Sequence, residues 1–377
     1  MKLVIISHTE HYTLPDGSVV GWGPTITEIN HLTRIFDCIV HVAMLQPGEA
    51  PPSALPYTNS NVSFVALPAV GGSGIVAKWK VVQAAPKVIK IVNQELKSAD
   101  YFQLRTPTGI GVYLIPYLSH VSKIPGWFKY AGNWNQEKPP MGYGIQRWLL
   151  KHQSRPVTIN GSWPNQPKHC ITFENPCLTA KDLSMGLEVL SSKTFLGPLH
   201  LCYVGRLESP KGVGRFISAL RTLDPVIKAK LGEVHLVGDG AERQAFEAEA
   251  ALSGISIKFY GFLPRDQVFD IYKVCHGFVM PTTASEGFPK VLAEAMAFGC
   301  VPLVSDVSAI GQYIKTGCNG FIFDTVSVES IQKTLKAFTN MSNNNYLELI
   351  HHSKAVVAQF TFNYYNNHLK DSVISEL

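Results

Sequence analysis

The sequence has few cysteines and few charged residues for its length. Its seven cysteines among 377 residues include no CxxC pair, which argues against a disulfide framework and against a cysteine-rich zinc site. Charged residues make up 16% of the chain and hydrophobic residues 46%, a balance typical of folded globular proteins and not of disordered ones. We therefore expect reduced thiols in a cytoplasmic protein.

Long apolar runs and several catalytic motifs are also missing. No run approaches the roughly 20 residues that cross a bilayer, and the apolar run Leu3–Ile6 is too short for a signal peptide. The sequence contains no HExxH, GxSxG or GxxxxGK[ST]. Zinc hydrolysis, a serine hydrolase elbow and a P-loop therefore have no support.

Alternating strands and helices organise the chain into two α/β halves. In the first half we expect strands at 2–7, 39–45, 62–67 and 101–104 and irregular structure at 121–170. We expect helices at 25–36 and 76–97, the second of them interrupted at Pro86. In the second half we expect strands at 199–204, 233–237, 257–260, 277–280 and 301–305. Such alternation predicts a parallel sheet in each half. We expect domains at 1–194 and 195–355, followed by a C-terminal segment at 356–377.

The most specific pattern lies between Ser285 and Gly299. Glu286 and Glu294 bracket a loop-to-helix junction, where Pro289 suits the first helical position and Gly299 suits the stop. Eight helical residues rise about 12 Å, an upper bound on the axial separation of the two carboxylates. This span suits a ligand with polar ends and an anionic middle that faces the helix N-terminus. A nucleotide sugar has this layout.

Two cations and a glycine turn follow strands of the same half. Ligands bind at the carboxyl ends of parallel strands, so Arg206 and Lys211 could grip phosphate. The alternative, two solvated surface cations, is disfavoured because the Glu286–Glu294 pattern lies in the same half. The segment 238–243 lacks the third glycine of a dinucleotide fingerprint, so we interpret it as an ordinary strand-to-helix turn that could approach a ligand.

Weaker candidates lie in the first half. Gly21, Trp22 and Gly23 follow the first strand as a turn that could approach a sugar or phosphate, with an ordinary turn equally favoured. Arg105 ends a strand and either contacts an acceptor or phosphate or makes a structural ion pair. His8 also follows the first strand, although a lone histidine is more often structural than catalytic.

The formal net charge is +5, and the whole excess lies in residues 1–190. Part of it is a basic cluster around Trp79, made of Lys78, Lys80, Lys87, Lys90 and Lys97. We favour a solvated helix face, and the alternative is attraction to anionic lipid or to a phosphorylated acceptor. Nucleic acid is not an expected partner, because the excess is small and no recognition motif occurs.

Five segments, in order, resemble the retaining glycosyltransferases of family 4, also called group 1 glycosyltransferases, which have the GT-B fold. They are Tyr203–Leu207 with Lys211-Gly212, Leu236–Gly240, Phe259–Leu263, Pro281–Gly299 with its Glu-x7-Glu spacing, and Asn319–Phe321. The resemblance implies two Rossmann-like domains that face a cleft, the first binding the acceptor and the second the donor. It also implies that the final helices cross back to the first domain.

The resemblance assigns roles to single residues. Glu286 would contact the donor sugar, Glu294 the ribose, and Arg206 and Lys211 the diphosphate as negative charge develops on it. Further donor-side candidates are Gly205, Gly238, Gly261, Phe262, Gly287, Phe288, Pro289, Lys290, Val291, Gly21 and Gly23. The acceptor-side candidates are Arg105, His8 and Trp22. Gln103–Thr106 stands where many family members carry a histidine, and Arg105 would take some of its place.

We therefore expect a retaining hexosyltransferase that moves sugar from a nucleotide-sugar donor to a glycan or lipid-linked acceptor in cell-surface polysaccharide assembly. No Asp-x-Asp pair occurs, and two cations could neutralise the leaving group, so we expect neither a metal nor a cofactor. We expect a cytoplasmic location, with peripheral membrane association as an extension. Two alternatives stay open, a GT-B-like nucleotide-sugar epimerase and a non-catalytic nucleotide-sugar-binding protein.

Overall fold

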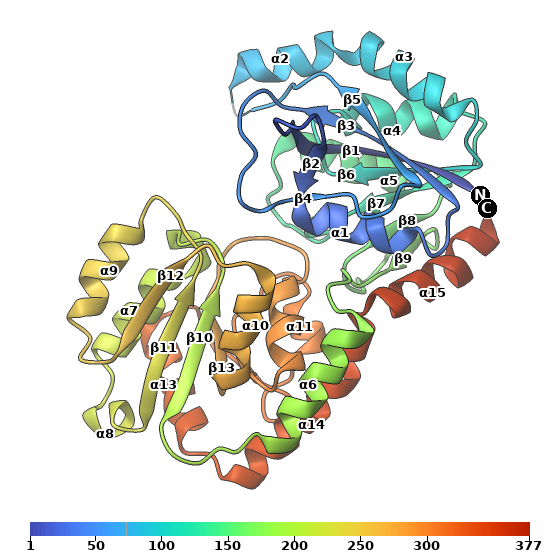
Figure 1. The fold of residues 1–377 in the computed structure, drawn as a ribbon. Helices are drawn as coiled ribbons and strands as arrows, with labels where there is room; N and C mark the ends of the chain where they lie inside the picture. Colours follow the sequence, from blue (N-terminus) through green and yellow to red (C-terminus); the bar gives the residue numbers. More distant parts are fainter. Residues whose placement is uncertain (73) are drawn as a thin grey trace. The chain divides into compact units, whose positions relative to one another are not determined.

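The computed structural model describes residues 1–72 and 74–377, which form two compact units (Figure 1). The N-terminal unit comprises Met1–Asn175 and Phe362–Leu377, and the C-terminal unit comprises Pro176–Thr361. The sequence predicted divisions at 194/195 and 355/356 instead. The first division falls earlier because helix α6 (Ala180–Ser192) packs on α11 (Lys290–Ala297) of the C-terminal unit.

A nine-stranded sheet forms the centre of the N-terminal unit. Its strands are β1 (Lys2–Thr13), β2 (Val19–Trp22), β3 (Cys38–Leu45), β4 (Ala54–Pro56), β5 (Val62–Leu67), β6 (Tyr101–Thr106), β7 (Gly126–Tyr130), β8 (Val157–Ile159) and β9 (Cys170–Thr172). The first half of β1 is parallel to β3 and β6, and its end pairs antiparallel with β2. The predicted turn at Gly21–Gly23 is therefore wrong, because Gly21 and Trp22 extend β2 and Gly23 begins a helix.

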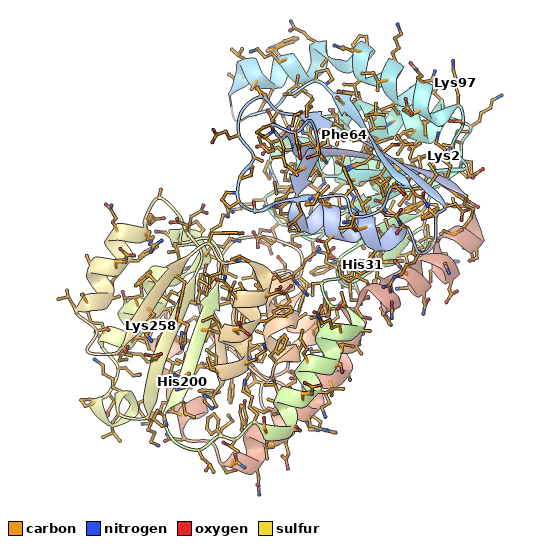
Figure 2. All side chains as sticks on the ribbon, viewed as in Figure 1. Lys2, His31, Phe64, Lys97, His200 and Lys258 are labelled. Carbon is orange, nitrogen blue, oxygen red and sulfur yellow. The ribbon has the colours of Figure 1, made fainter. Side chains whose placement is uncertain are left out.

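Helices cover both faces of this sheet. They are α1 (Gly23–Leu32), α2 (Ile75–Gln83), α3 (Ala85–Leu96), α4 (Gly111–His120), α5 (Met141–Lys151) and α15 (Phe362–Ser372). Alternate residues of β1 feed two cores, Leu3 and Ile5 packing with α1 and α15, and Val4 and Ile6 with α3 and α4. His31 on α1, labelled in Figure 2, stacks on Phe362 at 3.8 Å.

The sequence predicts some of these elements and misses others. The predicted break at Pro86 is confirmed, since α2 ends at Gln83 and α3 begins at Ala85. The irregular structure predicted for 121–170 is wrong, because three strands or parts of strands and one helix lie there. All five residues of β7 are buried, so this strand has no alternation of polar and apolar residues to reveal it.

The C-terminal unit contains a six-stranded parallel sheet in the order β12-β11-β10-β13-β14-β15. Its strands are β10 (Leu199–Val204), β11 (Leu231–Val237), β12 (Ile257–Gly261), β13 (Gly277–Met280), β14 (Val301–Val304) and β15 (Phe321–Ile322). The larger helices are α7 (Val213–Arg221), α9 (Arg243–Ala251), α10 (Arg265–Val274), α13 (Val328–Thr339) and α14 (Asn343–Gln359). Helix α7 packs with α9 and α13, while α11 packs with α6, α10 and α14, so the sheet is covered on both faces (Figure 1).

The five strands predicted for this half are confirmed, with ends that differ by two residues or fewer. All seven cysteines are free thiols, as expected. Among the described residues, no helix combines the length and the apolar character that a membrane span requires.

A buried chain of hydrogen bonds runs through the N-terminal unit. His11 Nδ1 lies 3.0 Å from the Thr9 carbonyl, which can only accept, so this nitrogen carries the proton. Tyr57 Oη therefore donates to His11 Nε2 at 2.9 Å and accepts from His41 Nδ1 at 2.7 Å. Ser7 Oγ then donates to His41 Nε2 at 2.8 Å. Burial favours neutral imidazoles, and in that state this one carbonyl sets the direction of every hydrogen bond in the chain.

This arrangement predicts acid sensitivity of the N-terminal unit. Burial lowers the pKa of His11 and lowers that of His41 well below its usual range. Below about pH 6.5 the unfolded chain binds protons that the folded unit does not, so stability falls by about 1.4 kcal/mol per pH unit for each histidine. All six tryptophans lie in this unit, so urea unfolding followed by tryptophan fluorescence measures the slope.

The variant His41→Gln should remove one histidine's share of this slope between pH 6 and pH 5. Tyr57→Phe is the matched control, because it lowers stability by about 1–3 kcal/mol at every pH but leaves both histidines buried and the slope unchanged. Equal slopes for the wild type and His41→Gln would contradict the neutral, buried state of His41.

Candidate functional site

Two loops at the carboxyl edge of the C-terminal sheet are hydrogen-bonded to each other. One follows β10 and the other follows β13, and these strands are neighbours. The Pro210 carbonyl accepts from the Thr283 amide at 2.8 Å and from Thr282 Oγ1 at 3.3 Å. Arg215 Nη2 donates to the Pro281 carbonyl at 3.0 Å. The two loops therefore form one unit at the edge where ligands bind in such sheets.

Gly212 is the point of closest approach between these loops. It has φ of +89° and caps the N-terminus of α7. A Cβ atom built on it would lie 2.0 Å from the Pro281 carbonyl oxygen. Only glycine meets both requirements, a left-handed backbone and direct contact with another backbone.

Two of the three predicted catalytic residues are in contact across these loops. Lys211 Nζ donates to Glu286 Oε1, with the lysine side chain largely buried and the carboxylate half-exposed. Arg206 is 66% exposed and pairs with Glu208 at 3.0 Å. The structure thus brings Lys211 and Glu286 together. It leaves Arg206, five residues before Lys211, exposed on the surface.

Three predicted glycines meet at the ends of neighbouring strands. The Gly238 amide donates to the Gly261 carbonyl at 2.8 Å. A Cβ atom on Gly238, which has φ of +128°, would lie 1.9 Å from the Gly205 carbonyl oxygen. These glycines lie at or just after the ends of β10, β11 and β12. Because they have no side chains, a ligand can approach their backbone closely. Phe262 follows directly and is 50% exposed.

Glu294 is held by an arginine that the sequence did not single out. Arg265, the first residue of α10, lies with Nε 3.4 Å from Glu294 Oε1, and its Nη2 donates to Asp182 Oδ2 at 2.9 Å. Its guanidinium stacks over the Phe269 ring at 4.2 Å. Burial raises the pKa of the Glu294 carboxyl. Asp182 lies three residues after Thr179, a capping box spacing that marks the start of α6. This spacing gives no sign of the contact between Asp182 and Arg265.

The residues around the start of α11 serve mainly through their backbone. Pro289 precedes the helix as its N-cap and does not occupy the first helical position that the sequence predicted. Gly287 lies in a bend. The Phe288 side chain is buried and stacks on Phe360 at 4.4 Å, so it anchors the loop to the core.

The next two residues of α11 are anchored through their carbonyl groups. The Lys290 carbonyl accepts from Cys177 Sγ at 3.6 Å, and the Val291 carbonyl accepts from Tyr272 Oη at 3.3 Å. Both contacts fix the helix against its own unit. Glu294, one turn later, is therefore presented from a rigid element.

Arg105 makes the structural ion pair that the sequence left as one of two alternatives. Its Nη2 lies 2.8 Å from Glu28 Oε1, and its Nε donates to Gln103 Oε1 at 3.1 Å. Lys129 Nζ contacts the same Glu28 oxygen at 2.5 Å. Glu28, a residue the sequence reading passed over, thus joins two cations inside the N-terminal unit. Its spacing with Ile26, Ile29 and Leu32 along the helix was the available signal.

The other first-half candidates lie in different settings. A Cβ atom on Gly21 would lie 2.5 Å from the His11 ring, and one on Gly23 would lie 2.7 Å from the Ser53 carbonyl oxygen, so both glycines permit close internal packing. Trp22 is exposed. His8 is largely buried, and burial lowers its pKa. The structure does not gather these four residues into one cluster.

Comparison with known sequences finds a family similarity in the C-terminal half. Residues 191–354 match the family model of group 1 glycosyl transferases. The chain is similar to the lipopolysaccharide 1,6-galactosyltransferase of Salmonella typhimurium, with 29% identity over 40% of this chain and 45% of the relative. It is also similar to the lipopolysaccharide 1,2-N-acetylglucosaminetransferase of the same organism, with 30% identity over 35% of this chain and 36% of the relative. The chain thus spans less than half the length of these curated relatives.

Comparison with solved structures covers the whole chain. HepE of Anabaena in complex with UDP matches with a TM-score of 0.71 and 15% identity over 100% of both chains. Sucrose-phosphate synthase of Thermosynechococcus elongatus matches with a TM-score of 0.73 and 14% identity, again over 100% of both chains. The predicted fold class is therefore confirmed as α/β, with the GT-B architecture of glycosyltransferases.

The contact at Gly212 predicts the cost of one added methyl group. Gly212→Ala should destabilise the C-terminal unit by several kcal/mol, because it adds a backbone clash to the roughly 1–2 kcal/mol cost of left-handed geometry. Gly197→Ala is the matched control, since Gly197 has φ of +83° and nothing within 4 Å of its built Cβ. Urea unfolding followed by circular dichroism compares them, and equal losses would contradict the loop contact.

Proposed function

We propose that this chain is a retaining glycosyltransferase that uses a nucleotide-sugar donor and no metal ion. The observation that carries the proposal is the Lys211–Glu286 contact at the carboxyl edge of β10 and β13. It sets a cation and a carboxylate side by side, next to bare glycine backbone and to the start of α11. This combination offers groups for a sugar, a diphosphate and a ribose in one place.

Charge decides how the donor would lie. A diphosphate would compete with Glu286 for Lys211 and would recruit the exposed Arg206, since an arginine binds phosphate oxygens bidentately. The free N–H groups at the start of α11 add a positive dipole end. Glu286, released from Lys211, would then accept hydrogen bonds from sugar hydroxyls. Glu294, fixed by Arg265, would accept from the ribose.

We further propose transfer on the face of the leaving group. Because Glu286 is assigned to sugar binding and not to attack, the acceptor oxygen itself attacks the anomeric carbon as the bond between that carbon and the phosphate oxygen breaks. The acceptor proton passes to the departing phosphate, whose charge Arg206 and Lys211 neutralise. This path retains the anomeric configuration. The donor-side set also includes the backbone of Gly205, Gly238, Gly261 and residues 287–291.

A glycan or lipid-linked acceptor in cell-surface polysaccharide assembly is the acceptor we propose for the N-terminal unit. The relatives with lipopolysaccharide transferase names support this class. Helix α2 supports a lipid surface, because Ile75, Val76, Trp79 and Val82 are exposed on it. Lys78 and Lys80 lie among them. Apolar and cationic side chains mixed on one exposed helix suit an anionic membrane surface.

Donor binding can be tested first by thermal shift. HepE of Anabaena has been crystallised with UDP and with UDP-glucose, so UDP-sugars lead a panel that also contains GDP-, ADP- and dTDP-sugars. A ligand at 100 times its Kd stabilises by about 2.7 kcal/mol. We then expect Glu286→Gln and Arg206→Ala to lower kcat with the identified donor by about 10²–10³-fold each.

Asp324→Asn is the matched control for this experiment, because Asp324 is an exposed carboxylate paired with Lys333 at 2.6 Å and should leave kcat unchanged. Undiminished transfer by Glu286→Gln and Arg206→Ala would end the assignment. Free nucleotide released without an acceptor product would favour an epimerase. Donor binding without turnover over many acceptors would favour a non-catalytic binding protein.

Membrane association can be tested with vesicles. Lys78→Gln combined with Lys80→Gln should weaken binding to phosphatidylserine vesicles by about 30-fold at low salt, since each lysine near an anionic surface contributes about 1 kcal/mol. Lys333→Gln combined with Lys336→Gln, on α13 of the C-terminal unit, should leave binding unchanged. Sedimentation with vesicles measures both, and the absence of wild-type binding at low salt would contradict the proposal.

A further inference from the structure

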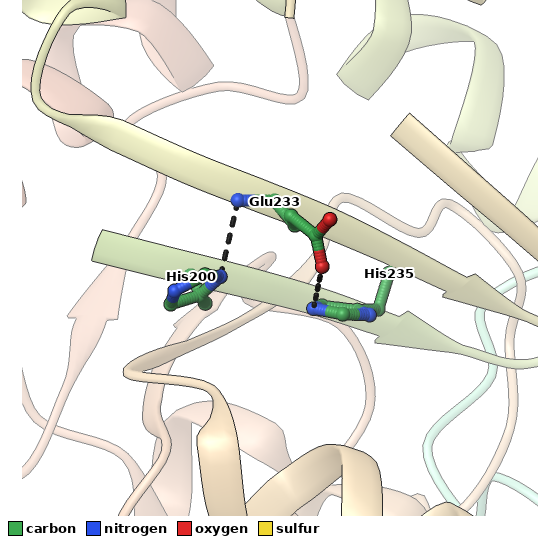
Figure 3. Close-up of side chains that lie close together, drawn as sticks. All are labelled: His200, Glu233 and His235. Carbon is green, nitrogen blue, oxygen red and sulfur yellow. Dashed lines mark hydrogen bonds and ion pairs between the residues drawn. The ribbon is translucent and has the colours of Figure 1, made fainter. Parts of the chain in front are cut away.

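A second cluster of polar side chains lies at the opposite edge of the C-terminal sheet. His200 is the second residue of β10, and Glu233 and His235 lie on the neighbouring strand β11 (Figure 3). One ligand atom from each residue lies within 4.8 Å of the other two. In the part of the chain that the structure describes, no other three His, Cys, Asp or Glu side chains come together in this way.

His235 presents an imidazole nitrogen with nothing to bind. The side chain is 4% exposed, and its Nε2 has no hydrogen-bond partner. The other nitrogen, Nδ1, lies 2.8 Å from Tyr260 Oη, which fixes the plane of the ring. Nε2 points at Glu233 Oε2 from 3.9 Å, too far for a hydrogen bond. In metal-ligating histidines, one ring nitrogen donates a hydrogen bond that orients the other toward the metal. With Nδ1 as the donor to Tyr260, Nε2 of His235 has this orientation.

Glu233 also turns a lone pair toward this point, and His200 lies beside it. Lys258 engages Glu233 Oε1 at 2.5 Å and leaves Oε2 facing His235. His200 Nδ1 accepts from the Glu233 amide at 3.1 Å, so the neutral ring carries its proton on Nε2 and Nδ1 is basic. His235 Nε2 and Glu233 Oε2 therefore face each other, with a His200 nitrogen within 4.8 Å of both, and a cation would stabilise this arrangement.

We propose that His200, Glu233 and His235 form a binding site for Zn²⁺. Two imidazoles and a carboxylate are ligands that zinc prefers. In a tetrahedral site with bonds of 2.0–2.1 Å, ligand atoms lie roughly 3.3 Å apart, so the 3.9 Å separation of His235 and Glu233 needs only a small contraction. To bind the ion, His200 must turn its ring so that Nδ1 leaves the Glu233 N–H. Water supplies the fourth ligand, because His200 and Glu233 are partly exposed.

This site is separate from the proposed donor site and does not depend on it. His200 lies near the start of β10 and Gly205 directly follows its end, about 16 Å away at the rise of an extended strand. The ion would join β10 to β11 and take no part in glycosyl transfer. His200 and Lys258 mark this region of the C-terminal unit in Figure 2.

The test is zinc binding by the full chain after removal of metals with EDTA. Competition with a chromophoric chelator should show one Zn²⁺ bound per chain. His235→Gln should lower the affinity at least 100-fold, and Tyr260→Phe, which keeps all three ligands, should lower it about 10–100-fold through loss of the orienting hydroxyl. Added Zn²⁺ should raise the Tm of the wild type and not that of His235→Gln.

His276→Gln is the matched control, because the His276 ring stacks on His200 at 6.0 Å but lies outside the cluster. Its affinity should equal that of the wild type within twofold. The visible spectrum of the Co²⁺-loaded chain provides a second readout and should change in Tyr260→Phe. The proposal is overturned if micromolar Zn²⁺ does not bind to the wild type. It is also overturned if His235→Gln and His276→Gln change the affinity for Zn²⁺ by the same factor.

Discussion

The contact between the turn after β10 and the loop after β13 is the constraint on which the candidate site depends. Gly212 abuts the Pro281 carbonyl, and the Pro210 carbonyl ties the same two segments together. Without a side chain at Gly212 the two loops reach contact distance, and Lys211 then meets Glu286. The backbone contact thus determines which charged groups meet in the site, because it brings together two side chains that are 75 positions apart in the sequence.

A second layer of contacts holds the other end of the site. Arg265 connects Glu294 to Asp182 and so links α11 to the capped start of α6. A carboxylate held in this way loses little conformational freedom when it binds a ligand. The N-terminal unit uses the same means in its interior, where Glu28 binds both Arg105 and Lys129. In both units a buried carboxylate is thus paired with a cation, Glu28 with Arg105 and Asp182 with Arg265.

Residue patterns predicted the C-terminal unit better than the N-terminal one. Strands flanked by glycine turns, and the spacing of Glu286 and Glu294, follow local rules, so their places could be read from the chain. The hairpin that contains Gly21 and the fully buried strand at 126–130 could not, because their residues follow tertiary packing. Arg265 was missed for a related reason. Its neighbours in the sequence do not indicate that it contacts Glu294 and Asp182, which lie on other helices.

A crystal structure of the full chain with a UDP-sugar tests the central claim most directly. The account predicts the diphosphate against Lys211, Arg206 and the start of α11, with Glu286 at the sugar and Glu294 at the ribose. Glycines 205, 238 and 261 should border the nucleotide. A donor bound elsewhere, with the Lys211–Glu286 contact unchanged, would contradict it.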